Sequence, residues 1–120
     1  MLSSVRAIAG AGLLLVALGT VPVAAHHGWS SYDSTKELTL TGSIKEAGYE
    51  HPHGHVRLEV PGKVWLVVLA PPTRMERRGL PATMLKVGTA ATVVGYPHRS
   101  VEDELRAERI TIDGKTVELR

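Results

Sequence analysis

Apolar and polar residues alternate along several short stretches of this chain, which is the pattern of half-buried β-strands. The alternation over residues 38–44 predicts a first strand, and Gly42 lies within it, where a strand can bend sharply. Residues 56–60 alternate in the same way, and a Pro-Gly turn separates them from the apolar run 64–69. A turn between two such runs predicts a β-hairpin, so the first half of the chain contributes three strands.

A short helix is predicted after the hairpin. Thr73 and Glu76 have the spacing of a capping box, in which the threonine caps a helix over residues 74–78. Gly79 follows at the position where helices commonly end. We therefore expect a helix of little more than one turn.

Two further strands are predicted in the second half of the chain, over residues 89–95 and 105–112. In the second of them the apolar phase slips between Ala107 and Ile110, which indicates a β-bulge, and an Asp-Gly turn follows. Three strands, a short helix and two strands is the order of an OB-fold, so the predicted fold class is a small all-β barrel. A small open β-sandwich is the alternative, because periodicity alone does not separate the two.

The segment 1–25 has the pattern of a secretory signal peptide: a short basic start, an apolar run over residues 7–18 and small residues at its end. We expect cleavage before His26, which leaves one OB-like domain, residues 26–120, in the periplasm or outside the cell. An uncleaved membrane anchor is the alternative, because the apolar segment is close to the length that spans a bilayer. Its glycines and its proline make it a poor permanent span, so we expect no membrane contact after cleavage.

Composition and charge indicate a folded domain and argue against one class of partner, nucleic acid. The 120 residues include 14 Lys and Arg, 12 Asp and Glu and no Cys, and 43% of them are hydrophobic. This is the composition of a folded domain, and without cysteine an exported domain has to rely on its core alone. The leader holds one of the basic residues and no acidic one, so the mature domain is nearly neutral. That charge argues against nucleic acid as a partner.

Histidines carry the strongest chemical signal in the chain, and two of them, His26 and His27, stand at the predicted mature start. If His26 is the first residue, its free α-amine and its imidazole can chelate one metal ion through two nitrogens, the arrangement called a histidine brace. A third nitrogen from another histidine completes a set that favours Cu(II). The expected cofactor is therefore copper, with zinc as the alternative.

A second histidine cluster supplies candidates for the third nitrogen. His51, His53 and His55 share one strand phase, and the proline and glycine between them predict a loop leading into a strand. We expect two of the three to converge, with His53 as the preferred ligand; the alternative is that all three are ordinary solvated side chains. His98 follows a predicted turn and could approach the cluster, whereas Met75 is expected in the core rather than on a metal.

Four short motifs resemble an uncharacterised family of small secreted bacterial proteins. They are His-His-Gly-Trp-Ser-Ser-Tyr-Asp over residues 26–33, Leu-Thr-Leu-Thr-Gly over 38–42, Tyr-Glu-His-Pro-His over 49–53 and Val-Gly-Tyr-Pro over 94–97. The chain departs from the family pattern at His51, where the family usually has asparagine, so His51 is a weaker candidate than His53. The resemblance implies an exported single domain and marks His26, His27 and His53, but it supplies no activity.

The familiar signatures of catalysis are missing from the sequence. It has no Cys nucleophile, no Gly-x-Ser-x-Gly elbow, no phosphate-binding loop and no His-Glu-x-x-His pair. We therefore expect a copper carrier or buffer rather than an enzyme, with the metal ion and another periplasmic protein as its partners. The alternative is a metal-free module that holds a small ligand or a protein partner on a surface formed by Trp29, Tyr49 and Tyr96.

Overall fold

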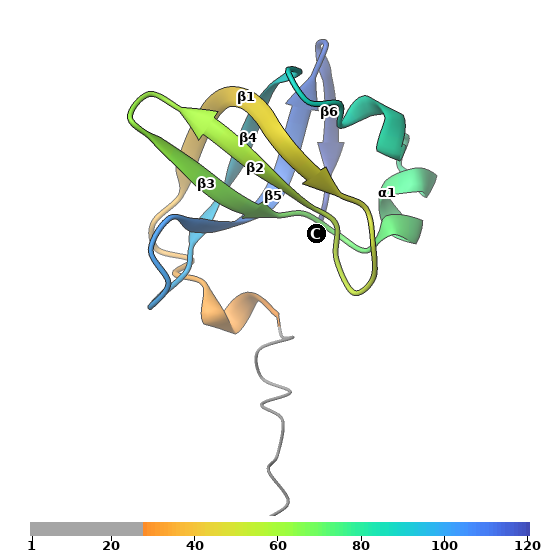
Figure 1. Ribbon diagram of the computed structural model, residues 1–120. Helices are drawn as coiled ribbons and strands as arrows, with labels where there is room; N and C mark the ends of the chain where they lie inside the picture. Colours follow the sequence, from red (N-terminus) through yellow and green to blue (C-terminus); the bar gives the residue numbers. More distant parts are fainter. Residues whose placement is uncertain (1–27) are drawn as a thin grey trace, which may run out of the picture.

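The computed structural model describes residues 28–120 (Figure 1). The predicted signal peptide, its cleavage site and the two leading histidines, His26 and His27, lie outside these described residues. The strands are β1 (Leu38–Gly48), β2 (His55–Val60), β3 (Lys63–Val68), β4 (Ala90–Pro97), β5 (Glu104–Ile112) and β6 (Lys115–Glu118). One α-helix, α1 (Pro72–Arg77), and two 3-10 turns, Trp29–Ser31 and Ala82–Met84, complete the fold.

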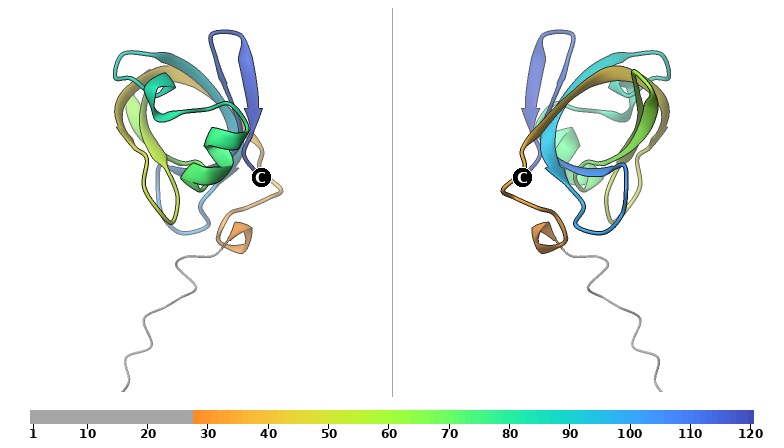
Figure 2. Two further views of the ribbon diagram at one scale, coloured as in Figure 1. Left: turned by 90° about the vertical axis from the view of Figure 1, so that its right-hand side faces the viewer. Right: turned by 90° about the vertical axis from the view of Figure 1, so that its left-hand side faces the viewer.

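Five of the strands close into a barrel, which confirms the predicted small all-β barrel. The sheet order is β3-β2-β1-β4-β5-β6, and a parallel pairing of β3 with β5 joins the two sides. Strand β6 stands outside the closed ring as a hairpin partner of β5. Figure 2 looks along the barrel and shows α1, the connection between β3 and β4, lying across one open end.

All five predicted strands are present, with several ends shifted by one residue and with three larger differences. Strand β1 runs on to Gly48 after an irregularity between Ile44 and Glu46, so it is longer than its alternating part. Strand β4 extends to Pro97. Strand β6 was not predicted as a separate strand, since it offers only one buried apolar residue, Val117.

The predicted bulge in β5 is confirmed. Val94 pairs with Arg109, whereas Gly95 pairs with Ala107, so Glu108 is the extra residue between them. The capping-box prediction, by contrast, is wrong. The helix begins at Pro72 with Pro71 as its N-cap and no side-chain cap, because proline is well suited to the first helical position.

The barrel interior is filled by apolar side chains from all five of its strands and from α1. The largest fully buried ones are Ile44, Leu58, Leu69, Met75, Leu80, Leu105, Ile110 and Leu119. The burial of Met75 agrees with its expected core position and keeps its sulfur away from any exposed metal site. Within residues 28–120 no helix is long and apolar enough to cross a membrane.

The first described residues pack against the loop between β4 and β5. Tyr32 forms an isolated β-bridge with His98, and the Asp33 amide donates to the carbonyl of Pro97 at 2.8 Å. The Arg99 amide donates to the carbonyl of Ser31 at 3.0 Å. These backbone bonds hold the start of the described chain at the end of the barrel where β4 leads into β5.

Candidate functional site

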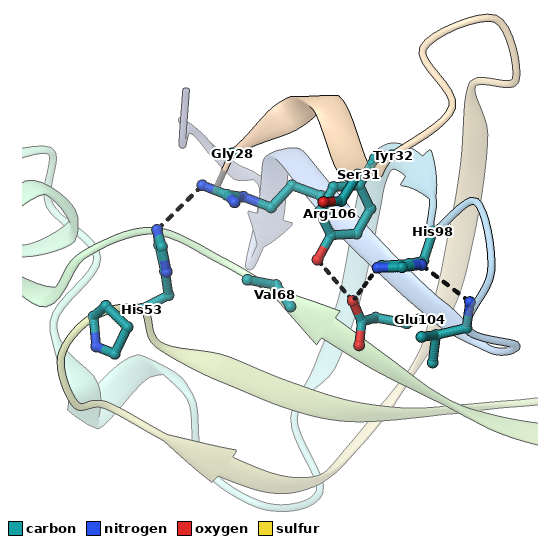
Figure 3. A pocket seen from close by; sticks show the side chains of 10 residues that line it. Gly28, Ser31, Tyr32, His53, Val68, His98, Glu104 and Arg106 are labelled. Atoms are coloured by element: carbon teal, nitrogen blue, oxygen red, sulfur yellow. Dashed lines mark hydrogen bonds and ion pairs between the residues drawn. The ribbon is translucent and has the colours of Figure 1, made fainter. Parts of the chain in front are cut away.

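A pocket of about 350 Å³ opens where the N-terminal segment meets the barrel (Figure 3). This volume lies at the small end of the range for small-molecule sites. Segments far apart in the chain form the walls, and the lining residues are Gly28, Ser31, Tyr32, Pro52, His53, Val68, His98, Val101, Glu104 and Arg106. The pocket is therefore the place where the predicted histidine loop meets the first residues that the structure describes.

Glu104 and Tyr32 form a hydrogen-bonded pair on one side of the pocket. The Tyr32 hydroxyl donates to a Glu104 carboxylate oxygen at 2.7 Å, and Tyr32 is only 7% exposed. Burial raises the pKa of Tyr32 far above its ordinary value, and the hydrogen bond to Glu104 raises it further. Tyr32 consequently stays a hydrogen-bond donor to Glu104 at every physiological pH.

His98 lies beside this pair, and its hydrogen bonds fix its tautomer. Its Nδ1 accepts from the backbone amides of Ser100, at 3.1 Å, and Val101, at 3.0 Å. The proton of the neutral imidazole is then on Nε2, which lies 3.9 Å from a Glu104 carboxylate oxygen. Neither nitrogen keeps a lone pair for a metal, so His98 is a poor metal ligand even though it lines the pocket.

Arg106 and His53 form a second polar pair across the pocket. Nη2 of Arg106 lies 3.2 Å from Nε2 of His53. A guanidinium can only donate, so Nε2 of His53 is the acceptor and carries a lone pair. Arg106 is 6% exposed, and its guanidinium carbon lies 4.7 Å from the ring centroid of Trp29.

The surroundings of Arg106 are poor in negative charge. Within residues 28–120 its Nε has no hydrogen-bond partner, and its guanidinium forms no ion pair with a carboxylate. Burial lowers the pKa of Arg106, and the nearby cations Arg74 and Arg120 lower it as well. The interaction with Tyr32 acts in the opposite direction and raises this pKa. The pocket wall thus contains a buried cation that forms no ion pair with the residues that the structure describes.

The structure sets His51 apart from the other two clustered histidines, His53 and His55. His51 is exposed on a bend, while His53 is half-buried in the pocket. His55 opens β2, its ring lies against Gly48 of β1, and it shares a second cavity of about 330 Å³ with His53. Across residues 28–120 no three His, Asp or Glu side chains are grouped so as to hold a metal ion.

The three aromatic residues proposed as a ligand surface have different partners. Trp29 meets Tyr96 edge-on with ring centroids 6.1 Å apart, and the Arg120 guanidinium carbon lies 4.5 Å from the Trp29 centroid. The Tyr49 hydroxyl donates to the carbonyl of Leu80 at 2.6 Å, just beyond α1. Trp29 and Tyr96 thus contact each other, whereas Tyr49 is bonded near α1.

Sequence reasoning missed Glu104 and Arg106 as site residues. They stand two positions apart on β5, so both side chains point to the same face of the strand. That phase is the outward one, on which charged residues are ordinary. The sequence shows only that Arg106 stands between two apolar residues, Leu105 and Ala107. The burial of Arg106 becomes evident only in the structure, where Trp29 lies over its guanidinium.

The high pKa of Tyr32 has a measurable consequence for stability. A folded-state pKa above the unfolded value of about 10 means that stability is complete below that pH and is lost as the pH rises above it. We expect the free energy of unfolding to fall above pH ~10, and less steeply in Tyr32→Phe. Urea unfolding across this range measures both slopes. Tyr96→Phe is the control, because Tyr96 also donates to a glutamate but is more exposed, and it should change the slope less.

Comparison with solved structures supports the fold. A crystal structure of a complex of TiaS with a tRNA and ATP contains a chain that is similar to this protein, with a TM-score of 0.51 and 21% sequence identity. The alignment covers 74% of this chain and 20% of that chain, so this protein spans about a fifth of its length. At this identity the likeness concerns the barrel fold alone.

Comparison of sequences places the chain in a family. No functionally curated protein matches it. A profile described as a family of unknown function, DUF6152, matches residues 13–105, which is most of the chain and includes every residue of the pocket except Arg106. On this match, the protein belongs to the DUF6152 family.

Proposed function

We propose that this protein is an exported metal-binding protein that holds copper at its mature N-terminus and acts as a carrier or buffer. The observation that supports this proposal is that Gly28 and His53 line the same pocket. Successive Cα atoms are about 3.8 Å apart, so the Cα of His26 lies within about 7.6 Å of the Cα of Gly28. In the proposed site, the amine and imidazole of a mature His26 would bind the ion together with the imidazole of His53.

The proposed ligand set is the α-amine and imidazole of His26 together with the imidazole of His53. His53 suits this role because its Nε2 carries a lone pair, which now accepts a hydrogen bond from Arg106. His27 is the neighbouring alternative, whereas His51 and His55 stand on the bend and the strand to either side. A set of three nitrogens favours Cu(II) over other divalent ions, with Zn(II) as its main competitor.

A carrier or buffer fits the small size of the pocket and the short loops around it. An ion held at the chain terminus can be passed to or taken from another periplasmic protein without opening the barrel. The proposal does not need a substrate surface, and it assigns no catalytic residue.

The free terminus is the feature that tests the proposal. We would titrate Cu(II) into exported protein that mass spectrometry shows to begin at His26, and into a form with one additional N-terminal residue. The first form should give an EPR spectrum of nitrogen-rich tetragonal Cu(II), and the extended form should bind at least about tenfold more weakly, because it lacks the terminal chelate. Equally weak binding by both forms would overturn the proposal.

The third nitrogen is tested by His53→Ala. We expect this change to weaken Cu(II) binding about tenfold or more, in line with the loss of a metal ligand. His51→Ala is the matched control, since His51 lies two residues away on an exposed bend, and it should leave the affinity unchanged. An equal loss in both variants would remove His53 from the ligand set.

If Cu(II) affinity proves independent of the terminus, a metal-free periplasmic module is the remaining candidate. The observation that favours a small ligand over a protein partner is the pocket with a buried cation in its wall. In that case the histidines act as polar contacts rather than as ligands to a metal.

A further inference from the structure

Arg106 is a buried cation for which the described protein provides no anion. Its exposed fraction is 6%, and Nε lacks a hydrogen-bond partner among residues 28–120. Nη2 lies 3.2 Å from Nε2 of His53, and the guanidinium carbon lies 4.7 Å from the Trp29 ring centroid. Such burial is unfavourable unless an opposite charge or further hydrogen bonds compensate it. Figure 3 shows the Arg106 side chain running along the pocket toward His53.

The missing anion cannot be an acidic side chain from the rest of the chain. Residues 1–27 contain no Asp and no Glu. The closest acidic lining residue, Glu104, is already bonded to Tyr32 and forms no ion pair with Arg106. These observations favour a separate molecule as the source of a compensating anion.

We propose that this pocket binds a small monocarboxylate, whose carboxylate pairs with the guanidinium of Arg106. The inference does not depend on the copper proposal, because it uses residues 28–120 alone. It also gives the metal-free module a definite class of ligand.

The lining of the pocket fits such a ligand. A guanidinium presents parallel N–H donors that match the two oxygens of a carboxylate. Ser31 adds a hydroxyl, while Pro52, Val68 and Val101 supply apolar contacts for a short hydrocarbon tail. Glu104 on the same wall repels a second negative charge, which favours a monocarboxylate over a dicarboxylate.

The test compares butyrate with butyramide, which has nearly the same shape and no charge. NMR titration in a metal-free buffer without carboxylates would follow the Nε–H resonance of Arg106. We expect butyrate to shift this resonance and to bind at least about tenfold more tightly than butyramide, since charge-assisted hydrogen bonds are about twice as strong as neutral ones. No binding of butyrate, or equal binding of the two, would overturn the proposal. Tighter binding of inorganic phosphate would overturn the assignment to carboxylates.

Two variants locate the ligand. Arg106→Met should reduce butyrate affinity at least about tenfold, whereas Arg109→Met, which removes the same charge from an exposed position on β5, should leave it unchanged. Glu104→Gln should tighten butyrate binding, because it removes the nearby negative charge, and it keeps the proposal testable if Arg106→Met does not fold. Weaker binding in Glu104→Gln, or unchanged binding in Arg106→Met, contradicts the proposed site.

The copper and carboxylate proposals fail independently. The form with one additional N-terminal residue should bind butyrate as well as the form that begins at His26, although it is expected to lose Cu(II). A loss of butyrate binding in the extended form would show that the carboxylate site needs the free terminus, and would contradict the inference.

Discussion

Gly95→Ala is expected to destabilise the barrel by about 3 kcal/mol, because an added methyl group overpacks a close contact between two strands. A Cβ at this position would overlap the backbone carbonyl of Arg106 and lie 2.8 Å from the Cα of Ala107, both on β5. Backbone atoms within a paired sheet cannot move aside as a flexible side chain can. A loss of this size shifts the folding equilibrium by more than about a hundredfold, which urea unfolding would detect directly.

Gly88→Ala separates this steric effect from the general cost of replacing glycine. Gly88 has a positive φ of 91°, but no atom lies within 4 Å of its added Cβ. Its substitution should therefore cost about 1 kcal/mol, from backbone conformation alone. Equal losses at the two positions would show that the contact between β4 and β5 is not the cause. The Gly95 contact also bears on the site, because the carbonyl that it touches belongs to Arg106.

The barrel could be predicted from the sequence because most of its strands have a recognisable local pattern of apolar and polar residues. The alternation in β2, the turn before β3 and the phase slip around Glu108 are all properties of short windows, and each has its counterpart in the structure. The errors are local as well. Thr73 has the residue type and spacing of a cap, but Pro72 before it is better suited to begin the helix, so Thr73 lies inside the first turn.

The site was less predictable because it depends on contacts between distant segments. The bridge between Tyr32 and His98 brings the N-terminal segment onto the loop before β5, and this contact has no signature in the sequence. Arg106 looked like an ordinary outward residue of a strand. Its guanidinium lies over the ring of Trp29, near the start of the described chain, and the guanidinium of Arg120, the last residue, lies over the same ring.

His53 was predicted as a metal ligand, and the structure adds detail on the surroundings of its imidazole. The sequence marked it as the histidine most able to join a metal site, and it does lie in the pocket that Gly28 reaches. The structure adds that its Nε2 is held by Arg106, so a cation and a metal ion would compete for one lone pair. His98, which also reaches the pocket, has its nitrogens committed to backbone amides and to the side facing Glu104.

This competition gives Arg106→Met opposite effects on the two proposed ligands. The variant should lose butyrate, as argued above, but we expect it to raise the Cu(II) affinity of the mature protein about thirtyfold. Nη2 of Arg106 is 3.2 Å from Nε2 of His53, so a metal ion bound to that nitrogen would lie within about 5 Å of the guanidinium. A unit charge and a doubly charged Cu(II) ion at that separation repel by about 7 kcal/mol at an effective dielectric constant of about 20. Exposure of the pocket to water weakens this repulsion, and we expect about 2 kcal/mol of it to remain, which corresponds to the thirtyfold change.

Arg109→Met is the control that separates the local effect of Arg106 on Cu(II) affinity from the effect of the overall charge. It lowers the net charge of the protein by the same amount from an exposed position on the same strand, where Arg109 pairs with Glu118 at 3.0 Å. If both variants raised the Cu(II) affinity equally, the gain would reflect the overall charge, and Arg106 would not face the metal. The proposal expects a gain in Cu(II) affinity for Arg106→Met alone, and the loss of that gain in the double variant with His53→Ala. This result would place the metal ion on His53, because removing the guanidinium then frees the lone pair that the metal uses.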